Sequence, residues 1–135
     1  TQELWWPQPA PPERAAQRDW VDGHLLAALA AETASQVILI GKALGTFGAR
    51  VAADRELPAI WLTPALSREE NVADLRRATA PTLLIGGTAD PAWAPRAARD
   101  LERDCPQIAY LEIEHVDSAL EPEHEQSAEG GSVPF

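Results

Sequence analysis

Three loops of this chain occupy positions at which an enzyme that uses nucleophilic catalysis would carry its nucleophile, its acid and its base. Residues 41–45 (GKALG) follow the apolar run 37–40 (VILI) and place Ala43 at the centre of a G-x-x-x-G turn. A tight turn from a strand into a helix is where many enzymes hold a nucleophilic serine. Alanine has no atom that can attack a substrate, so this position predicts no covalent chemistry.

The other two loops follow later apolar runs of the chain. Asp90 comes shortly after the run 81–85, and Ser118 lies in the loop after the run 108–113. The order and spacing of the three loops match the order nucleophile, acid, histidine of a catalytic triad. Of the three positions, only Asp90 carries a side chain that the triad requires.

The apolar and polar patterns predict elements that alternate between strand and helix. The predicted strands are 3–6, 36–40, 58–62, 81–85 and 108–113, and the predicted helices are 13–31, 43–54, 67–78 and 95–103. The continuous β-branched run at 36–40 is typical of a strand buried on both sides. The helix at 67–78 is expected to carry Asn71 and Asp74 on its polar side. This alternation predicts an α/β fold with a mostly parallel sheet.

The chain resembles a family of small bacterial α/β hydrolases. The family's elbow GKSLGT corresponds to GKALGT at 41–46, its acid loop G-x-x-D-P to GTADP at 87–91, and its histidine loop A-D-H-x-L-E to VDSALE at 116–121. The resemblance covers about residues 3–121 and implies a three-layer α/β-hydrolase-like sandwich. It also implies that Ala43 stands at the nucleophile position, Asp90 at the acid position and Ser118 at the histidine position.

The former active site is expected to keep a ligand-binding pocket. The amides of Leu44 and Gly45 open the helix after the turn, which is a favourable place for a carboxylate, an enolate oxygen or a polarised carbonyl. Trp93, three residues after Asp90, is predicted to line the pocket mouth. His115 is a candidate to replace the missing imidazole, although a position at a strand end, pointing elsewhere, is favoured. No standard metal motif is present, and neither a metal nor a cofactor is predicted.

The resemblance also predicts a gap at the N-terminal side of the sheet. In the family, a strand lies between those matched by 3–6 and 36–40, and its sequence would precede Thr1. The loop after that strand supplies the second oxyanion-hole amide, so the domain at 1–121 is expected to lack at least one N-terminal strand. A separate N-terminal segment or a second chain is expected to complete the sheet. The alternatives are direct pairing of the two strands or a homodimer. Residues 122–135 are predicted to be an acidic tail containing Gly and Pro.

The composition argues against several classes of partner. The 135 residues carry a formal net charge of −10, which disfavours binding to nucleic acid or to an anionic membrane surface. No apolar run approaches the ~20 residues that span a bilayer. The single cysteine, Cys105, cannot form an internal disulfide and suits a reducing compartment, so a cytoplasmic location is predicted.

These observations lead to one main functional hypothesis and two alternatives. The main hypothesis is a non-hydrolytic pseudoenzyme of bacterial secondary metabolism that binds, cyclises or isomerises a small organic acid or carbonyl compound. The first alternative is a serine esterase or thioesterase inactivated by a Ser-to-Ala change at position 43. The second is a binding or scaffold protein without turnover.

Overall fold

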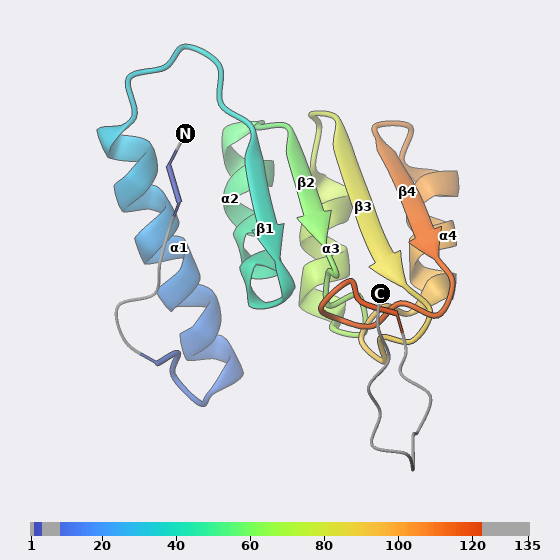
Figure 1. The fold of residues 1–135 in the computed structure, drawn as a ribbon. Coiled ribbons are helices and arrows are strands. Elements are labelled where there is room, and N and C mark those ends of the chain that lie inside the picture. The colour runs from blue at the N-terminus through green and yellow to red at the C-terminus, as the bar shows by residue number, and fades with distance from the viewer. Residues whose placement is uncertain (1, 4–8, 123–135) are drawn as a thin grey trace.

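The computed structural model describes residues 2–3 and 9–122, which form a small α/β unit with four strands (Figure 1). The elements in chain order are α1 (Arg14–Ala31), β1 (Leu39–Lys42), the 3₁₀ helix η1 (Ala43–Gly48), α2 (Ala49–Arg55), β2 (Ala59–Leu62), α3 (Glu69–Arg77), β3 (Thr82–Gly87), α4 (Pro95–Asp104) and β4 (Ile108–Ile113). The prediction of an α/β fold with a parallel sheet is confirmed. The strand predicted at 3–6 and the tail after residue 122 lie outside the described residues, apart from Glu3.

Local sequence explains where several helices begin and end. Pro95 occupies the first turn of α4, where its missing N–H and fixed φ suit a helix start. Acidic residues stand in the first turn of α3 and arginines in its last turn, as the helix dipole favours. Helix α2 ends at Arg55, and the next residue, Glu56, has a left-handed backbone (φ 55°) that closes the last turn.

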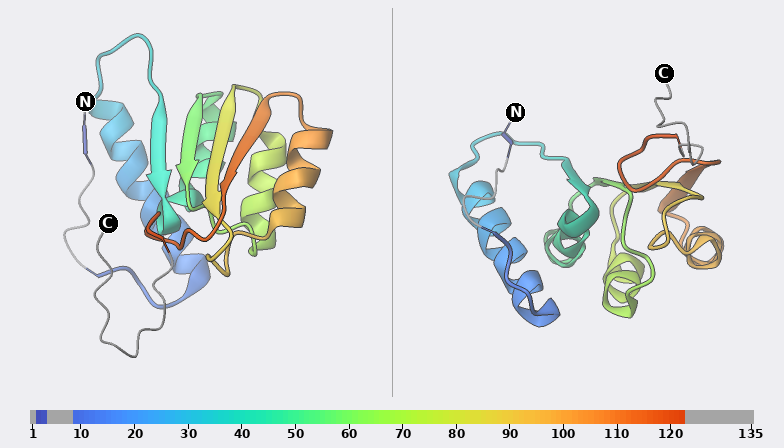
Figure 2. Two further views of the ribbon diagram at one scale, coloured as in Figure 1. Left: turned by 45° about the vertical axis from the view of Figure 1, so that its right-hand side comes forward. Right: turned by 60° about the horizontal axis from the view of Figure 1, so that its bottom comes forward.

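The strand order explains why the helices lie on one side of the sheet. The strands follow the order β1-β2-β3-β4, and every neighbouring pair is parallel. Because crossovers between parallel strands are right-handed, a monotonic order places the crossover helices α2, α3 and α4 on the same face. Figure 2 shows α1 to α4 on one side of the sheet. The described residues therefore form two layers rather than the three that the sequence predicted.

The bare face corrects one further expectation. The run at 36–40 was expected to be buried on both sides, but Ile38 is 63% exposed and Ile40 is 66% exposed. Their neighbour Leu39 points to the helices and is 8% exposed. The apolar run correctly indicates that a strand is present, but β1 begins at Leu39 and continues to Lys42, so it overlaps the predicted range 36–40 at two residues. The number of covered faces depends on the strand order.

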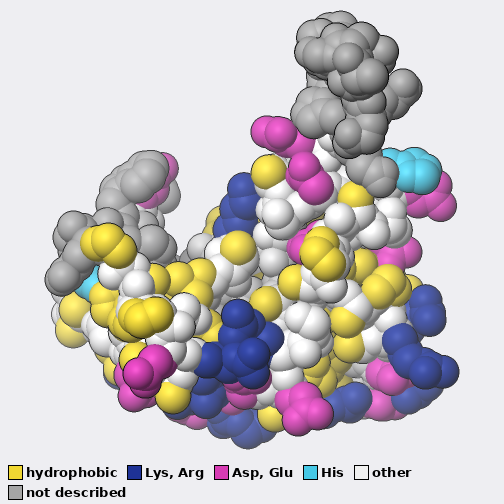
Figure 3. Space-filling model, turned by 90° about the horizontal axis from the view of Figure 1, so that it is seen from below, with side chains coloured by type: hydrophobic (Ala, Val, Ile, Leu, Met, Phe, Trp, Pro, Cys, Tyr) yellow, Lys and Arg dark blue, Asp and Glu magenta, His cyan; other side chains and the backbone are white. Residues whose placement is uncertain are grey.

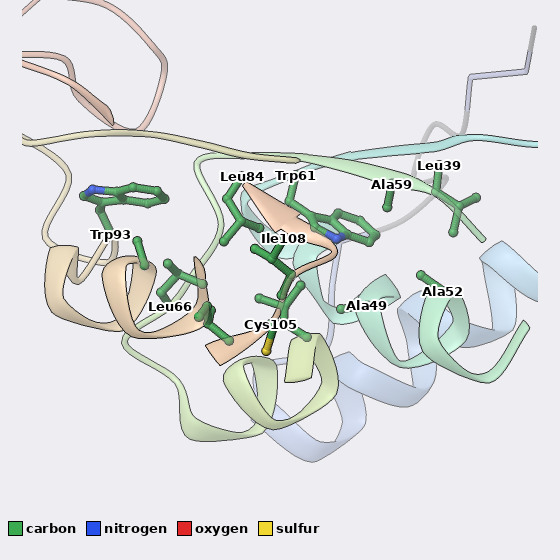
Figure 4. Close-up of a cluster of buried hydrophobic side chains, with 13 residues drawn as sticks. Leu39, Ala49, Ala52, Ala59, Trp61, Leu66, Leu84, Trp93, Cys105 and Ile108 are labelled. Carbon is green, nitrogen blue, oxygen red and sulfur yellow. The ribbon is translucent and has the colours of Figure 1, made fainter. Parts of the chain in front are cut away.

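The core lies between the sheet and the helices (Figure 4). It includes the fully buried side chains of Trp61, Leu84 and Leu101. Two glycines make room for its large rings. A Cβ at Gly41 would lie 2.5 Å from the ring of Trp61, and a Cβ at Gly86 would lie 2.0 Å from the ring of Trp93. Any side chain at either glycine would therefore push a core tryptophan aside.

Buried polar groups connect α1 to α3. Asn71 and Asp74, expected on the polar side of a helix, are only 1% and 5% exposed, so that expectation is wrong. The Asp74 carboxylate accepts a hydrogen bond from Arg18 of α1 at 2.5 Å and another from Arg77 at 3.2 Å. The Asn71 amide donates to the carbonyl of Ala65 at 3.1 Å. These partners from other segments allow polar side chains to face inward.

Candidate functional site

A cavity of about 330 Å³ opens at the carboxyl ends of the strands. Ala43 and Leu44 after β1, Thr63 after β2, Asp90 after β3 and Ser118 after β4 contribute to its wall. The structure thus brings the three predicted triad positions, Ala43, Asp90 and Ser118, to one cavity. Figure 3 views the molecule from this edge and shows Lys and Arg side chains among apolar ones near its centre. In open α/β sheets, ligands bind beside the carboxyl ends of the strands.

The turn after β1 has the strained geometry of an elbow. Ala43 has a positive φ of 50°, a conformation that costs an L-residue roughly 1–2 kcal/mol. The Thr46 hydroxyl, fully buried, donates to the carbonyl of Ala43 at 2.6 Å. The Thr46 hydroxyl oxygen also accepts a hydrogen bond from the backbone N–H of Ala65 at 3.3 Å, which ties the turn to the loop after β2. Strain held by surrounding contacts is characteristic of functional turns.

The two glycines of the turn have different roles. Gly41 is needed because a Cβ there would also lie 3.1 Å from the carbonyl oxygen of Gly45, in addition to clashing with Trp61. Gly45 has no atom within 4 Å of the place where a Cβ would stand. Leu44 contributes to the cavity wall, whereas Gly45 does not. The first amides of a helix have no acceptor inside it, so the Leu44 N–H can serve a ligand.

Asp90 is held in place by the loop after β3. It is 6% exposed, and its Oδ1 accepts the N–H of Ala92 at 2.9 Å. Its other oxygen, Oδ2, is buried without a hydrogen-bond partner in the described part of the chain. Gly87 lets the loop after β4 approach, because a Cβ there would lie 2.0 Å from the carbonyl oxygen of Val116. This contact brings Ser118 to the same cavity as Asp90.

Two further residues of the same wall each have a buried oxygen without a hydrogen-bond partner within the described residues. These oxygens are Oδ1 of Asn71 and Oγ1 of Thr63. Buried polar atoms in proteins are nearly always hydrogen-bonded, so each exception needs an explanation. Three such acceptors around one cavity indicate a place where hydrogen-bond donors from outside the chain would be stabilised.

Arg68 adds a positive charge to this acceptor-rich wall. Its guanidinium carbon lies 5.5 Å from the centre of the Phe47 ring, and both residues contribute to the cavity wall. Stacking on an aromatic face leaves the planar edge of a guanidinium able to bind a carboxylate. Sequence reasoning missed Arg68, Thr46 and the inward role of Asn71. The available signal for Arg68 was its place in the loop after a parallel strand.

Two predicted site residues lie elsewhere. Trp93 is fully buried, and its indole N–H donates to Glu112 at 2.7 Å. It belongs to the core below Gly86 and not to a pocket mouth, so that prediction is wrong (Figure 4). His115 is exposed, has a φ of 62°, and its backbone N–H donates to the hydroxyl of Thr88 at 2.7 Å. Among the described residues, no histidine contributes to the cavity wall.

Other features of the described residues do not point to chemistry. No group of three His, Cys, Asp or Glu side chains in them could hold a metal ion. A second hollow of about 370 Å³ lies between α3 and α4, but none of the unpartnered buried atoms found in the described part belongs to its wall. Within residues 2–3 and 9–122, no helix is both long and apolar enough to cross a membrane.

Comparison with protein-family models, curated proteins and solved structures gives no significant match to this chain. The resemblance to the α/β hydrolases therefore stays a prediction.

Proposed function

We propose that the cavity binds a small organic acid or carbonyl compound that carries a hydrogen-bond donor, and that the chain does not hydrolyse esters. The observation that carries this proposal concerns Asp90, a residue of the cavity wall, whose buried Oδ2 has no hydrogen-bond partner among the described residues. A ligand hydroxyl, amine or amide that donates to this oxygen supplies the missing hydrogen bond. A charge-assisted bond of this kind contributes about 1.5–3 kcal/mol.

The rest of the wall selects the ligand class. Arg68 pairs with a carboxylate or a carbonyl oxygen, and Leu44 offers its amide to the same oxygen. Asn71 accepts a second donor from the ligand through its unpartnered Oδ1. The volume of about 330 Å³ fits a small molecule, since ligand pockets span roughly 300–1,000 Å³.

The described residues of this cavity support proton transfer. Ala43 cannot form an acyl intermediate, and no imidazole is available from the described residues to relay a proton. The Asp90 carboxylate can accept a proton from the carbon next to a carbonyl group and return it to another atom of the same molecule. Arg68 and the Leu44 amide stabilise the negative charge on the carbonyl oxygen meanwhile. Such a sequence isomerises or cyclises a substrate without net addition of water.

The binding part of this proposal is tested with small 2-hydroxy and 2-oxo carboxylates, with their methyl esters as neutral counterparts. Titration calorimetry should show binding of the acids and weaker binding of the esters. Asp90→Asn should weaken binding at least about tenfold, because the new amide replaces an acceptor by a donor. Asp100→Asn on α4 is the matched control and should leave binding unchanged.

The role of Arg68 is tested in the same way. Arg68→Gln should weaken the binding of the acids more than that of the esters. Arg96→Gln, at an exposed position of α4, should change the binding of neither. Equal affinity of the wild type, Asp90→Asn and Arg68→Gln for every acid would refute the site. A saturable esterase rate in the unchanged chain would refute the non-hydrolytic assignment.

A further inference from the structure

The cavity at the carboxyl ends of the strands has one positive and one negative side chain in its wall. These are Arg68, in the loop after β2, and Asp90, in the loop after β3. The other lining residues in the described part of the chain are apolar or carry neutral polar groups. The ion pairs found among the described residues do not include one between Arg68 and Asp90.

Neither of these two charges has a partner of opposite sign among the described residues. The other half-buried arginines there, Arg18 and Arg50, each pair with an aspartate. The other buried aspartate, Asp74, pairs with two arginines. A charge that leaves water without a partner is costly, so such groups are normally paired. Arg68 and Asp90 are therefore two exceptions to the pattern of this chain, and both belong to one cavity.

We propose that this cavity binds an amino acid in its zwitterionic form, with the ammonium group on Asp90 and the carboxylate on Arg68. The inference rests on the proposed function above and names the hydrogen-bond donor that the ligand carries. A zwitterion brings an opposite charge to both groups, whereas a hydroxy acid brings one to Arg68 alone. Hydrogen bonds to charged groups are roughly twice as strong as those between neutral ones.

The hydrogen-bond acceptors of the wall also favour an ammonium group over a hydroxyl group. Besides Asp90, the lining residues Thr63 and Asn71 each have a buried side-chain oxygen without a partner in the described part of the chain. The Asn71 amide nitrogen donates to the carbonyl of Ala65, which leaves Oδ1 as the acceptor. An ammonium group has three donors, whereas a hydroxyl group has one. An ammonium group can therefore compensate more of these acceptors.

The apolar part of the wall limits the side chain of the amino acid. Ala43, Leu44 and Phe47 line a volume of about 330 Å³. A small or medium-sized apolar side chain, as in alanine or leucine, suits this lining because its burial is favourable. A charged side chain would bring a third charge, for which the described residues of the wall offer no further partner.

Titration calorimetry of the full chain compares alanine and leucine with counterparts that keep one charge each. Lactate and 2-hydroxy-4-methylpentanoate keep the carboxylate, and the methyl esters of the two amino acids keep the ammonium group. At least one of the two amino acids should bind at least about tenfold more tightly than both of its counterparts. This comparison uses the unchanged chain, so it does not depend on the folding of a variant.

Two variants separate the roles of the two charges. Asp90→Asn should weaken the binding of the amino acid more than that of the hydroxy acid, and so remove the preference between them. Arg68→Gln should weaken both ligands about equally and so keep the preference, because both carry the carboxylate. Asp100→Asn, on α4 and outside the cavity wall, is the matched control and should change neither affinity. Circular dichroism establishes which variants are folded, and only those are scored.

The outcomes distinguish this inference from the proposed function. A hydroxy acid that binds as tightly as its amino acid would overturn the inference and leave the proposed function intact. No binding of any of these acids would overturn both. A preference for the amino acid that persists in folded Asp90→Asn would overturn the placement of the ammonium group.

Discussion

The two glycines Gly41 and Gly45 are expected to differ in how well they tolerate a larger side chain. In Gly41→Ala, the new Cβ would lie 2.5 Å and 2.7 Å from two ring carbons of Trp61. This ring is 2% exposed and packed in the core, so it cannot rotate away without displacing neighbours. Overpacking of this kind destabilises a domain by about 1–3 kcal/mol. We expect Gly41→Ala to lower the free energy of unfolding by that amount.

Gly45→Ala is the matched control, because Gly45 lies close to Gly41, in the 3₁₀ helix η1 that follows β1. A Cβ at Gly45 meets no atom within 4 Å, so no clash is expected. The substitution also removes the flexibility of glycine from η1, which stabilises a helix by up to about 1 kcal/mol. The two variants should therefore differ in stability by roughly 1–4 kcal/mol.

Urea unfolding followed by tryptophan fluorescence measures this difference. At roughly 4 °C per kcal/mol, Gly41→Ala should also lower the melting temperature by about 4–12 °C. Experiments at about 1 µM chain limit any contribution from association. A neutral Gly41→Ala, or an equal loss in both variants, would refute the packing of the turn against Trp61.

Two other predictions concern Ala43 in the cavity wall and Asp22 on α1. Ala43→Ser should not create esterase activity towards activated esters, because the described residues provide no imidazole at the cavity; a rate that saturates with ester would contradict this. Burial raises the pKa of Asp22 despite its hydrogen bond and ion pair with Arg50. Protonation of Asp22 therefore favours the folded state. This contribution to the free energy of unfolding is fully present below the ordinary pKa of Asp22, and it is lost as the pH rises through the raised pKa. Asp22→Asn should remove this slope from the stability–pH curve measured by urea unfolding, and an unchanged slope would contradict the assignment.

Periodicity and chain order made much of the fold predictable from sequence. The strand at 108–113 coincides with β4, and the helix predicted at 13–31 differs from α1 by one residue. The meeting of Ala43, Asp90 and Ser118 could be anticipated because parallel strands end at one edge. An apolar run indicates a strand but does not reveal how many of its faces are covered.

Burial of single side chains was harder to predict, because it depends on distant partners. Asn71 and Asp74 lie inward because segments elsewhere in the chain supply a carbonyl group and an arginine. Trp93 is buried because Gly86, on β3, leaves room for its ring. Arg68 belongs to no motif, and its place at the cavity follows only from the loop geometry after β2.

The monotonic strand order also has a consequence for how the chain unfolds locally. Each strand pairs only with its neighbours in sequence, so the sheet resembles a short array of repeated βα units. Strands β3 and β4 pair over six positions, from Thr82↔Ile108 to Gly87↔Ile113, whereas β1 and β2 pair over four. Opening can therefore start at the β1 end while the remaining strands stay paired. Amide hydrogens of β1 should exchange with solvent sooner than those of β3, and the Arg18–Asp74 ion pair, which joins α1 to α3, should slow this opening.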